Sequence, residues 1–287
     1  MRVLLTGSSG FIGSYFYNNY KEHLEIKTFS FLREKIENIN FKNIEAVVHC
    51  GALVHKMHEI PYEDYFKANV EQTINLASCA KKNNVSNFIF ISTVKIYGEE
   101  TDLVLNEKSL PNPLDSYSLS KFEAEKKLLE LQDKNFKISI LRIPLVYGHG
   151  VKANFKSLVN LIKKISILPF GKIFNKRSIV YVGNVAHILY QIIIQNKNGI
   201  FIAVDNKAIS TSMLITEIAR ALNRKMILFK IPFFGTMIKI IRPNIYKRLY
   251  LSLELDNSST LHRLGIVNNK YHFREALKET FNKLNNS

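Results

Sequence analysis

The chain has 287 residues, of which 46% are hydrophobic, 22% charged and 11% aromatic. This composition excludes intrinsic disorder and fibrous architectures, and the length allows one large or two modest domains. The formal net charge is +16, from 40 basic and 24 acidic residues. The excess is mostly lysine and is spread along the chain, so we expect no nucleic-acid partner. An anionic small-molecule substrate is compatible with it.

Cysteine usage and hydropathy favour a cytoplasmic protein. Cys50 and Cys79 are the two cysteines, and their spacing supports neither a disulfide framework nor a thiolate metal site, so we expect no metal. The N-terminal segment has no signal-peptide pattern. The longest apolar stretch, 226–241, is interrupted by two lysines and a proline and is too short to span a bilayer.

In the first half of the chain, short β-branched or aromatic segments alternate with longer amphipathic ones. The strand-like segments are 3–6, 26–30, 46–49 and 87–92, and the helix-like segments are 11–20 and 62–81. This alternation is typical of βαβ units, and a helix near 116–131 and a strand near 138–142 extend it. We therefore predict an α/β fold of the Rossmann type, a doubly wound parallel sheet with helices on both faces.

The chain changes character after Pro144, where prolines and glycines separate short elements. We predict a dinucleotide-binding domain over residues 1–148 and a smaller, irregular substrate lobe that makes up most of 149–287. The segment 178–205, which includes a helix near 184–195, is expected to rejoin the first domain.

A glycine-rich turn, Thr6-Gly7-Ser8-Ser9-Gly10-Phe11-Ile12-Gly13, follows the first strand and opens the first helix. Gly7 permits the tight turn, Gly10 lets backbone amides approach a pyrophosphate, and Gly13 lets the helix pack closely on the sheet. The N-terminus of the helix favours the diphosphate charge. We expect a dinucleotide to bind at Gly7, Ser9, Gly10, Phe11, Ile12 and Gly13.

The second predicted strand lacks an acidic residue at its end, where a carboxylate would hold the ribose hydroxyls of NAD. Ser30 and Arg33 occupy this region and are better placed to meet a 2′-phosphate. We therefore expect NADP(H) or NAD(H) as the cofactor, with NADP(H) favoured. The alternative is that Arg33 is an ordinary surface cation.

Tyr117 and Lys121 lie four residues apart, on one face of the predicted helix. A phenol with a pKa of about 10 is a poor base at neutral pH, but a neighbouring ammonium and an oxidised nicotinamide favour its phenolate. Thr93 ends the preceding strand and is placed to donate a hydrogen bond to a sugar oxygen. The alternatives are a surface contact for the pair and a capping role for Thr93.

Together these motifs resemble the extended short-chain dehydrogenase/reductases, the NAD-dependent epimerase/dehydratase family that acts on nucleotide sugars. The resemblance covers essentially the whole chain, through the glycine turn, Ser92-Thr93 with Tyr97-Gly98, the Tyr117 and Lys121 pair, and the segment 142–148. It implies that Thr93, Tyr117 and Lys121 are catalytic, that Tyr117 and Lys121 also contact the cofactor, and that Asn69 supports the site from its helix. It also implies a homodimer.

Sugar 4,6-dehydratases of this family carry Thr-Asp-Glu where the present chain has Thr93-Val94-Lys95. The missing carboxylates argue against elimination, which leaves epimerisation or reduction at C4. The chain is similar to a bacterial branch serving UDP-N-acetylhexosamines in O-antigen and capsule synthesis. That resemblance implies that Arg177 holds the nucleotide diphosphate, that Asn154 contacts the UDP, and that Ser92 and Lys95 face the sugar.

The absent carboxylate after the second strand favours a consumed cofactor, typically NADPH. We therefore expect reduction of a UDP-4-keto-6-deoxy-N-acetylhexosamine for surface polysaccharide synthesis. One alternative is a UDP-glucose or UDP-N-acetylglucosamine 4-epimerase with tightly bound NAD. Another is a catalytically silent, nucleotide-binding regulatory protein.

Residues 218–253 contain eight basic residues and no acidic one, interleaved with Phe233, Phe234, Met237 and Ile240. Such a segment fits a weak contact with an anionic membrane surface. The simpler interpretation is a helix of the substrate lobe with solvated lysines.

Overall fold

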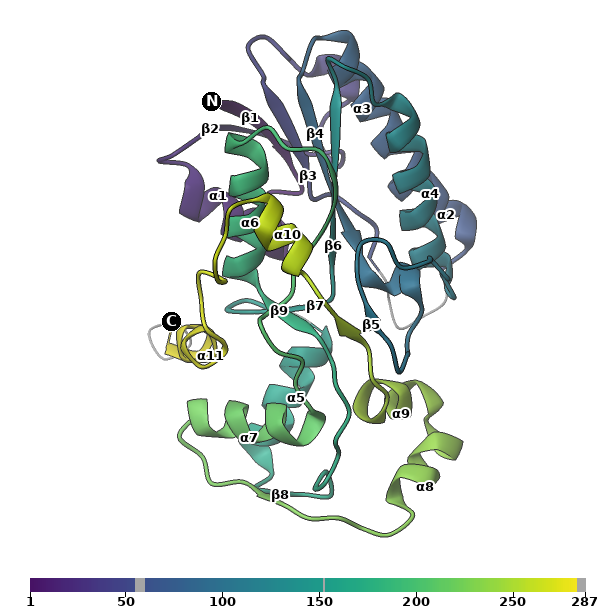
Figure 1. Ribbon diagram of the computed structural model, residues 1–287, viewed down its shortest axis with the longest axis vertical. Helices are drawn as coiled ribbons and strands as arrows, with labels where there is room; N and C mark the ends of the chain where they lie inside the picture. The colour runs from purple at the N-terminus through teal and green to yellow at the C-terminus, as the bar shows by residue number, and fades with distance from the viewer. Residues whose placement is uncertain (55–59, 152, 283–287) are drawn as a thin grey trace.

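The computed structural model describes residues 1–54, 60–151 and 153–282 (Figure 1). A parallel sheet of six strands lies at its centre, in the order β10-β6-β4-β3-β1-β2. The strands are β1 (Arg2–Thr6), β2 (Glu25–Phe29), β3 (Ala46–His49), β4 (Asn87–Thr93), β6 (Lys137–Ile143) and β10 (Gly199–Ile202). The strand order reverses between β1 and β3, which places a ligand crevice at their carboxyl ends. The predicted doubly wound fold is confirmed.

Helices cover both faces of the sheet (Figure 1). On one face, α1 (Phe11–Tyr20) and α6 (Val182–Ile194) pack on alternate strand residues such as Leu5 and Ile89. On the other face, α3 (Gln72–Lys82) and α4 (Ser116–Leu131) pack on the intervening residues, such as Phe88. Because both faces are buried, the strands are almost continuously apolar.

The single helix predicted over 62–81 is interrupted. It begins as α2 (Tyr62–Phe66), widens into a π-helical turn over Lys67–Glu71, and continues as α3. Asn69 lies in this turn and is buried, and its amide donates to the carbonyl oxygen of Leu53 and to Ser120 Oγ, each at 3.0 Å. The widened turn thus places the Asn69 side chain within hydrogen-bonding distance of Leu53 and of α4, and π-bulges are frequent at functional sites.

A second apolar cluster forms the core of the lobe after β6, where α5 (Ala153–Lys164), α7 (Thr211–Ala221) and α11 (Phe273–Asn282) pack on the paired strands β7 (Leu145–Tyr147) and β9 (Ile179–Tyr181). Two further parallel pairs are β8 (Ile167–Leu168) with β11 (Ile227–Leu228), and β5 (Val104–Leu105) with β12 (Glu254–Leu255). The remaining helices are α8 (Phe234–Ile241), α9 (Pro243–Tyr250) and α10 (Ser258–Arg263), with short 3-10 turns at Ile36–Asn38 and Val94–Tyr97. Among the described residues, no helix has the length and apolar character needed to cross a membrane.

Candidate active site

Several of the predicted site residues lie at the carboxyl edge of the sheet. The glycine turn follows β1, Ser30 follows β2, and Ser92 and Thr93 end β4. The helix α4 packs on β4 and β6 and carries both Tyr117 and Lys121. This edge is where open α/β sheets bind ligands.

The glycine turn leaves no room for side chains at Gly7 and Gly13 and little room at Gly10. Gly7 has φ +70°, and a Cβ there would lie 2.7 Å from the backbone of Cys50 and of Gly51. A Cβ at Gly13 would lie 2.3 Å from the carbonyl oxygen of Gly7, and one at Gly10 would lie 3.1 Å from the same oxygen. The first turn of α1 has no acidic residue and no side-chain cap, so its amides are available to an anion. The turn fits a dinucleotide pyrophosphate.

Ser30 and Arg33 lie beside this turn, because Phe29 at the end of β2 pairs with Thr6 at the end of β1. The backbone amide of Arg33 donates to the carbonyl oxygen of Ser30 at 3.0 Å, and the Arg33 side chain is exposed. The pair is therefore at the edge where the adenosine ribose of a bound dinucleotide would lie.

The two hydroxyls at the end of β4 differ in their hydrogen bonds. Thr93 Oγ1 accepts from the amide of Lys95 at 3.2 Å, which leaves its hydroxyl hydrogen for another acceptor. Ser92 is 2% exposed, and its Oγ is buried without a hydrogen-bond partner among the described residues. A buried hydroxyl without a partner costs free energy unless a ligand or water satisfies it. Both are thus suited to contact a polar substrate.

The N-terminus of α4 is fixed by a capping box. The carboxylate of Asp115 accepts from the amide of Ser118 at 2.6 Å, and the amide of Asp115 donates to Ser118 Oγ at 3.1 Å. Tyr117 lies in the first turn, with its ring edge-on to that of Tyr65 at 6.0 Å. The cap fixes the start of the helix and therefore the position of Tyr117.

Lys121 is buried, with 2% of its surface exposed, and its ammonium lies 3.7 Å from the centre of the Phe90 ring. Burial lowers the pKa of Lys121 from 10.5 to about 7, against the opposing effects of Glu125 and Cys50. Its charge in turn lowers the pKa of His49 and counteracts the rise in that of Cys50, both at the end of β3. The amine is therefore held under the site in a form that can gain or lose a proton near neutral pH.

The sequence led us to expect that a lysine neighbour and an oxidised nicotinamide together favour the phenolate of Tyr117, and the neighbouring protein groups act in the other direction. Burial, the Asp115 carboxylate and Tyr65 together raise the pKa of Tyr117. The reason is that Asp115 lies near Tyr117, whereas the Lys121 ammonium is directed toward Phe90 and the end of β3. The protein alone thus keeps Tyr117 as a neutral phenol.

The ammonium of Lys95, the residue expected to face the sugar, has two carboxylate partners in the protein. It forms ion pairs with Asp115 and, at 3.5 Å, with Glu99. Glu99 also pairs with Lys247 of α9 at 3.2 Å. Lys95 therefore links the cap of α4 to the lobe, and its charge is already compensated there.

Arg177 lies beside the C-terminal end of α9, and its backbone pairs with that of Ile209. Its guanidinium donates to the backbone carbonyl oxygens of Leu251 at 3.1 Å and of Lys247 at 3.4 Å. Burial lowers its pKa, and Glu99 opposes this effect. The helix α5 carries Asn154, whose side chain lies outside the described residues.

Glu125 is a buried charged residue of α4 that was not among the predicted site residues. Its carboxylate accepts from Arg142 Nη2 at 2.6 Å, and both side chains are almost fully buried. Arg142 Nη1 also donates to the hydroxyl of Tyr97 at 2.5 Å. Two features point to this pair: Glu125 lies four residues after Lys121 on the same helix face, and Arg142 is a cation inside an apolar strand.

A buried histidine supports the edge of the sheet beneath the glycine turn. The hydroxyl of Thr73 donates to the carbonyl oxygen of Asn69 at 2.7 Å, so it accepts from His49 Nε2 at 3.0 Å. His49 Nδ1 then accepts from the hydroxyl of Thr6 at 2.6 Å. Burial and Lys121 lower the pKa of His49 to about 3, which keeps it neutral.

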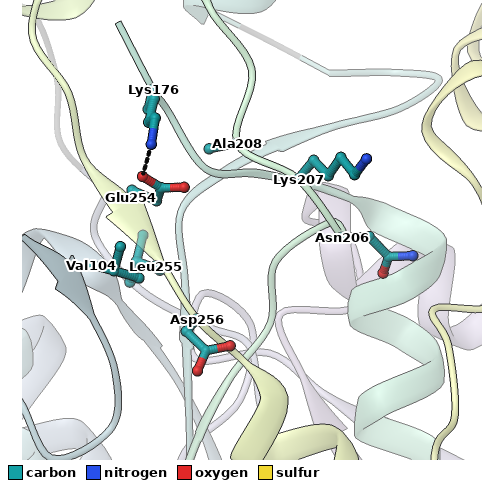
Figure 2. Close-up of a pocket in the computed structure, with 8 residues that line it drawn as sticks. All are labelled: Val104, Lys176, Asn206, Lys207, Ala208, Glu254, Leu255 and Asp256. Atoms are coloured by element: carbon teal, nitrogen blue, oxygen red, sulfur yellow. Dashed lines mark ion pairs between the residues drawn. The ribbon is translucent and has the colours of Figure 1, made fainter.

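Figure 2 shows a cavity of about 430 Å³ that lies apart from these residues, beside the β5 and β12 pair. Lys176 and Glu254 form an ion pair at 3.2 Å on one of its walls. The other lining residues are Val104, Asn206, Lys207, Ala208, Leu255 and Asp256. None of the predicted catalytic residues lines it. Over the described ranges, no group of three or more His, Cys, Asp or Glu residues is placed to hold a metal ion.

Comparisons with known proteins give a consistent family. A curated UDP-glucose 4-epimerase from Vibrio cholerae is 36% identical over 296 aligned positions, covering 92% of this chain and 89% of the relative. An N-acetyl-alpha-D-glucosaminyl-diphospho-ditrans,octacis-undecaprenol 4-epimerase from Escherichia coli O157:H7 is 26% identical, covering 80% of this chain and 75% of the relative. The crystal structure of UDP-N-acetylglucosamine 4-epimerase from Bacillus cereus superposes with a TM-score of 0.80 at 22% identity, covering 99% of each chain, and shows the shared fold.

The model of the NAD dependent epimerase/dehydratase family matches residues 3–203. This segment contains the glycine turn, Thr93, Tyr117 and Lys121, together with all six strands of the central sheet. The chain belongs to the NAD dependent epimerase/dehydratase family.

Proposed function

We propose that the protein is a UDP-sugar 4-epimerase that uses a tightly bound nicotinamide dinucleotide. The observation that carries the proposal is the placement of Tyr117, Lys121 and Thr93 at the sheet edge beside the glycine turn, in a chain 36% identical to a UDP-glucose 4-epimerase. The relatives favour epimerisation over the ketoreduction expected from the sequence, because both curated relatives described above are named as 4-epimerases.

In this proposal Tyr117 removes the proton from the C4 hydroxyl of the sugar. When bound, the dinucleotide would supply a hydride acceptor for C4 and a hydride for the opposite face of the rotated 4-keto sugar. Thr93, whose hydroxyl hydrogen is free of the capping bond, donates to the same sugar oxygen and holds it near Tyr117. Lys121 would contact the bound dinucleotide from its buried position, and the oxidised nicotinamide would favour the phenolate of Tyr117 during the proton transfer.

The same proposal assigns the binding residues. The glycine turn and the first amides of α1 hold the dinucleotide diphosphate, with Ser9, Phe11 and Ile12 lining it. Arg177 meets the diphosphate of the UDP-sugar, because a planar guanidinium suits such an anion. Ser92, a buried hydroxyl without a partner among the described residues, faces the hexose.

Ketoreduction is the second candidate. The support for it is the segment after β2, which has Ser30 and Arg33 in the region where a carboxylate would select NAD. With NADPH consumed in each turnover, the product would be a reduced UDP-6-deoxy-N-acetylhexosamine. The homodimer and the cytoplasmic location stay predictions from the sequence.

The two reactions are separated by supplying substrate with and without reductant. The purified protein is incubated with UDP-glucose or UDP-N-acetylglucosamine in the absence of added NADPH, and the products are resolved by anion-exchange chromatography and proton NMR. We expect conversion to the galacto epimers. No conversion, combined with rapid NADPH oxidation in the presence of a UDP-4-keto-6-deoxy-N-acetylhexosamine, would exclude the epimerase and establish the reductase.

A further inference from the structure

The helix α8 carries an apolar surface that the protein leaves uncovered. Phe233 is 85% exposed and Ile240 is 77% exposed, and Met237 and Ile241 are also exposed. Figure 1 shows α8 at the end of the lobe far from the central sheet. Exposed large apolar groups in such a cluster commonly mark an interaction site.

The helical spacing gathers these side chains on one side of α8. Met237 lies three residues before Ile240 and four residues before Ile241, so the three side chains share a face of the helix. Phe234 and Ile238 are only partly exposed and lie on the adjoining side of the helix, where Phe234 contacts Phe170 with ring centres 6.1 Å apart. One side of α8 is thus packed on the lobe, and the apolar face next to it is exposed to solvent.

The turn before α8 presents Phe233 outward. Its backbone is left-handed, with φ 60°, a conformation that bulky side chains rarely adopt. Its carbonyl oxygen accepts from the amide of Met237 at 2.9 Å, which holds the turn against the helix. The strained turn keeps an aromatic ring at the exposed end of the apolar face.

Cations without acidic partners surround this face. The segment 218–253 has eight basic residues and no acidic one. Within the described part of the chain, ion pairs to acidic residues form at its two ends, Arg220 with Glu217 and Lys247 with Glu99, and none forms at Lys230, Lys239 or Arg242. The positive charge around the apolar face is therefore uncompensated.

We propose that this α8 surface, formed by Phe233, Met237, Lys239, Ile240, Ile241 and Arg242, docks on an anionic lipid bilayer. The apolar face enters the boundary between headgroups and acyl chains, while Lys239 and Arg242 meet lipid phosphates and extend their methylene stems along the apolar surface. An amphipathic helix of this kind lies in the plane of the membrane surface.

The charge distribution favours a bilayer over a second copy of the chain. A symmetric contact through the α8 surface would bring Lys239 and Arg242 of one copy close to the same cations of the other, which is repulsive. A nucleic acid would leave the apolar face in water, because phosphates pair with the cations alone. A bilayer offers acyl chains to the apolar side chains of the α8 surface and anionic headgroups to its cations.

Flotation with lipid vesicles tests the proposal on the full chain. We expect the protein to float with vesicles of phosphatidylcholine and phosphatidylglycerol at low salt, and to float much less with phosphatidylcholine alone or at high salt. K239E/R242E should lower the partition coefficient on the order of 20-fold or more, since each cation near the surface contributes about fivefold. I240S/I241S should lower it about tenfold.

Matched variants on distant surfaces control for charge and hydrophobicity. Lys21→Glu with Lys42→Glu removes two exposed cations elsewhere, and Leu110→Ser with Val267→Ser removes two exposed apolar side chains. Both controls should float like the parent protein. Circular dichroism and sugar turnover should show that every variant is folded.

Three results would overturn the proposal. The first is a parent protein that does not float with anionic vesicles. The second is equal flotation of the parent and both α8 variants. The third is a change in the sedimentation coefficient of I240S/I241S without vesicles, which would assign the surface to contact between copies of the chain.

Discussion

Lys95 forms an ion pair with Asp115, the carboxylate that caps the helix carrying Tyr117. Asp115 raises the pKa of Tyr117, whereas Lys95 and Ser118 stabilise the charge of Asp115 and lower its pKa despite the opposing effect of burial. Lys95 therefore acts on Tyr117, the proposed acid/base residue, through the cap and without touching it, which makes Lys95 a positioning residue in that proposal.

This relationship predicts opposite shifts in the pH dependence of turnover. Asp115→Asn keeps a capping side chain but removes a negative charge, so the pKa of Tyr117 should fall and the acidic limb of kcat/KM should move down by about half a pH unit. Lys95→Met leaves the Asp115 charge uncompensated and should move the limb up by about the same amount.

The double variant distinguishes this effect from a general loss of structure. If Lys95 acts through Asp115, adding Lys95→Met to Asp115→Asn should shift the limb little further. Equal shifts in both backgrounds would show that Lys95 acts on the site directly.

Replacing Tyr117 tests the assignment of the acid/base. Tyr117→Phe should lower kcat by about 10²- to 10⁴-fold, because the phenol moves the proton of the sugar hydroxyl. Bound dinucleotide should be retained, as measured by the absorbance of the denatured protein. Tyr65→Phe is the matched control, since it keeps the ring beside Tyr117, and it should stay within about threefold of the parent. Normal turnover in Tyr117→Phe would refute the mechanism.

The buried amine of Lys121 predicts a link between pH and stability. The pKa of Lys121 falls from 10.5 in the unfolded chain to about 7 in the folded protein. Between these pH values the unfolded chain binds more protons, so the contribution of Lys121 to stability becomes more favourable as pH rises through this range. Below it, the penalty for burying the charge is fully present.

Lys121→Met should therefore stabilise the dinucleotide-free protein while abolishing turnover. We expect its free energy of unfolding to exceed that of the parent by roughly 2–4 kcal/mol at about pH 6 and the difference to shrink toward about pH 10. Denaturant unfolding at several pH values measures this. Lys127→Met removes an exposed lysine from the same helix as a control, and a pH-independent difference for Lys121→Met would contradict the prediction.

The glycine turn predicts a strong effect of one methyl group. A Cβ at position 13 would lie 2.3 Å from the carbonyl oxygen of Gly7, a backbone atom that cannot move without opening the turn. Gly13→Ala should destabilise the protein by about 1–3 kcal/mol and weaken dinucleotide binding.

Gly265→Ala is the matched control for Gly13→Ala. Gly265 also disfavours a side chain, with φ +64°, but its Cβ would have open space. It should lose some stability and bind the dinucleotide normally. Tight binding by Gly13→Ala would contradict the close packing of helix and strand.

The sheet and its edge could be predicted because their signals are local. The strand preceding the glycine turn and the four-residue spacing of Tyr117 and Lys121 each lie within one short segment. The helix expected near 116–131 agrees with α4 (Ser116–Leu131). The widened turn at Asn69 could not be predicted, because it depends on hydrogen bonds to Leu53 and Ser120.

The ion pairs around the site could not be predicted from the sequence either. Lys95 meets Asp115, twenty positions later, and Glu99 meets Lys247, 148 positions later, so neither pairing has a periodic signal. The effect of Asp115 on the pKa of Tyr117 could not be predicted either, since this carboxylate neighbour is set by the cap and not by the Tyr117 and Lys121 spacing.

His49 has a consequence for behaviour in acid. Protonating it would require Nδ1 to give up the bond it accepts from Thr6, the residue from which the glycine turn departs. With its pKa near 3, this imidazole stays uncharged through mildly acidic conditions in which solvent-facing histidines become cations. The hydrogen bond between His49 and Thr6, beneath the glycine turn, should consequently persist in mildly acidic solution. A loss of activity at such a pH would then originate in other titratable groups.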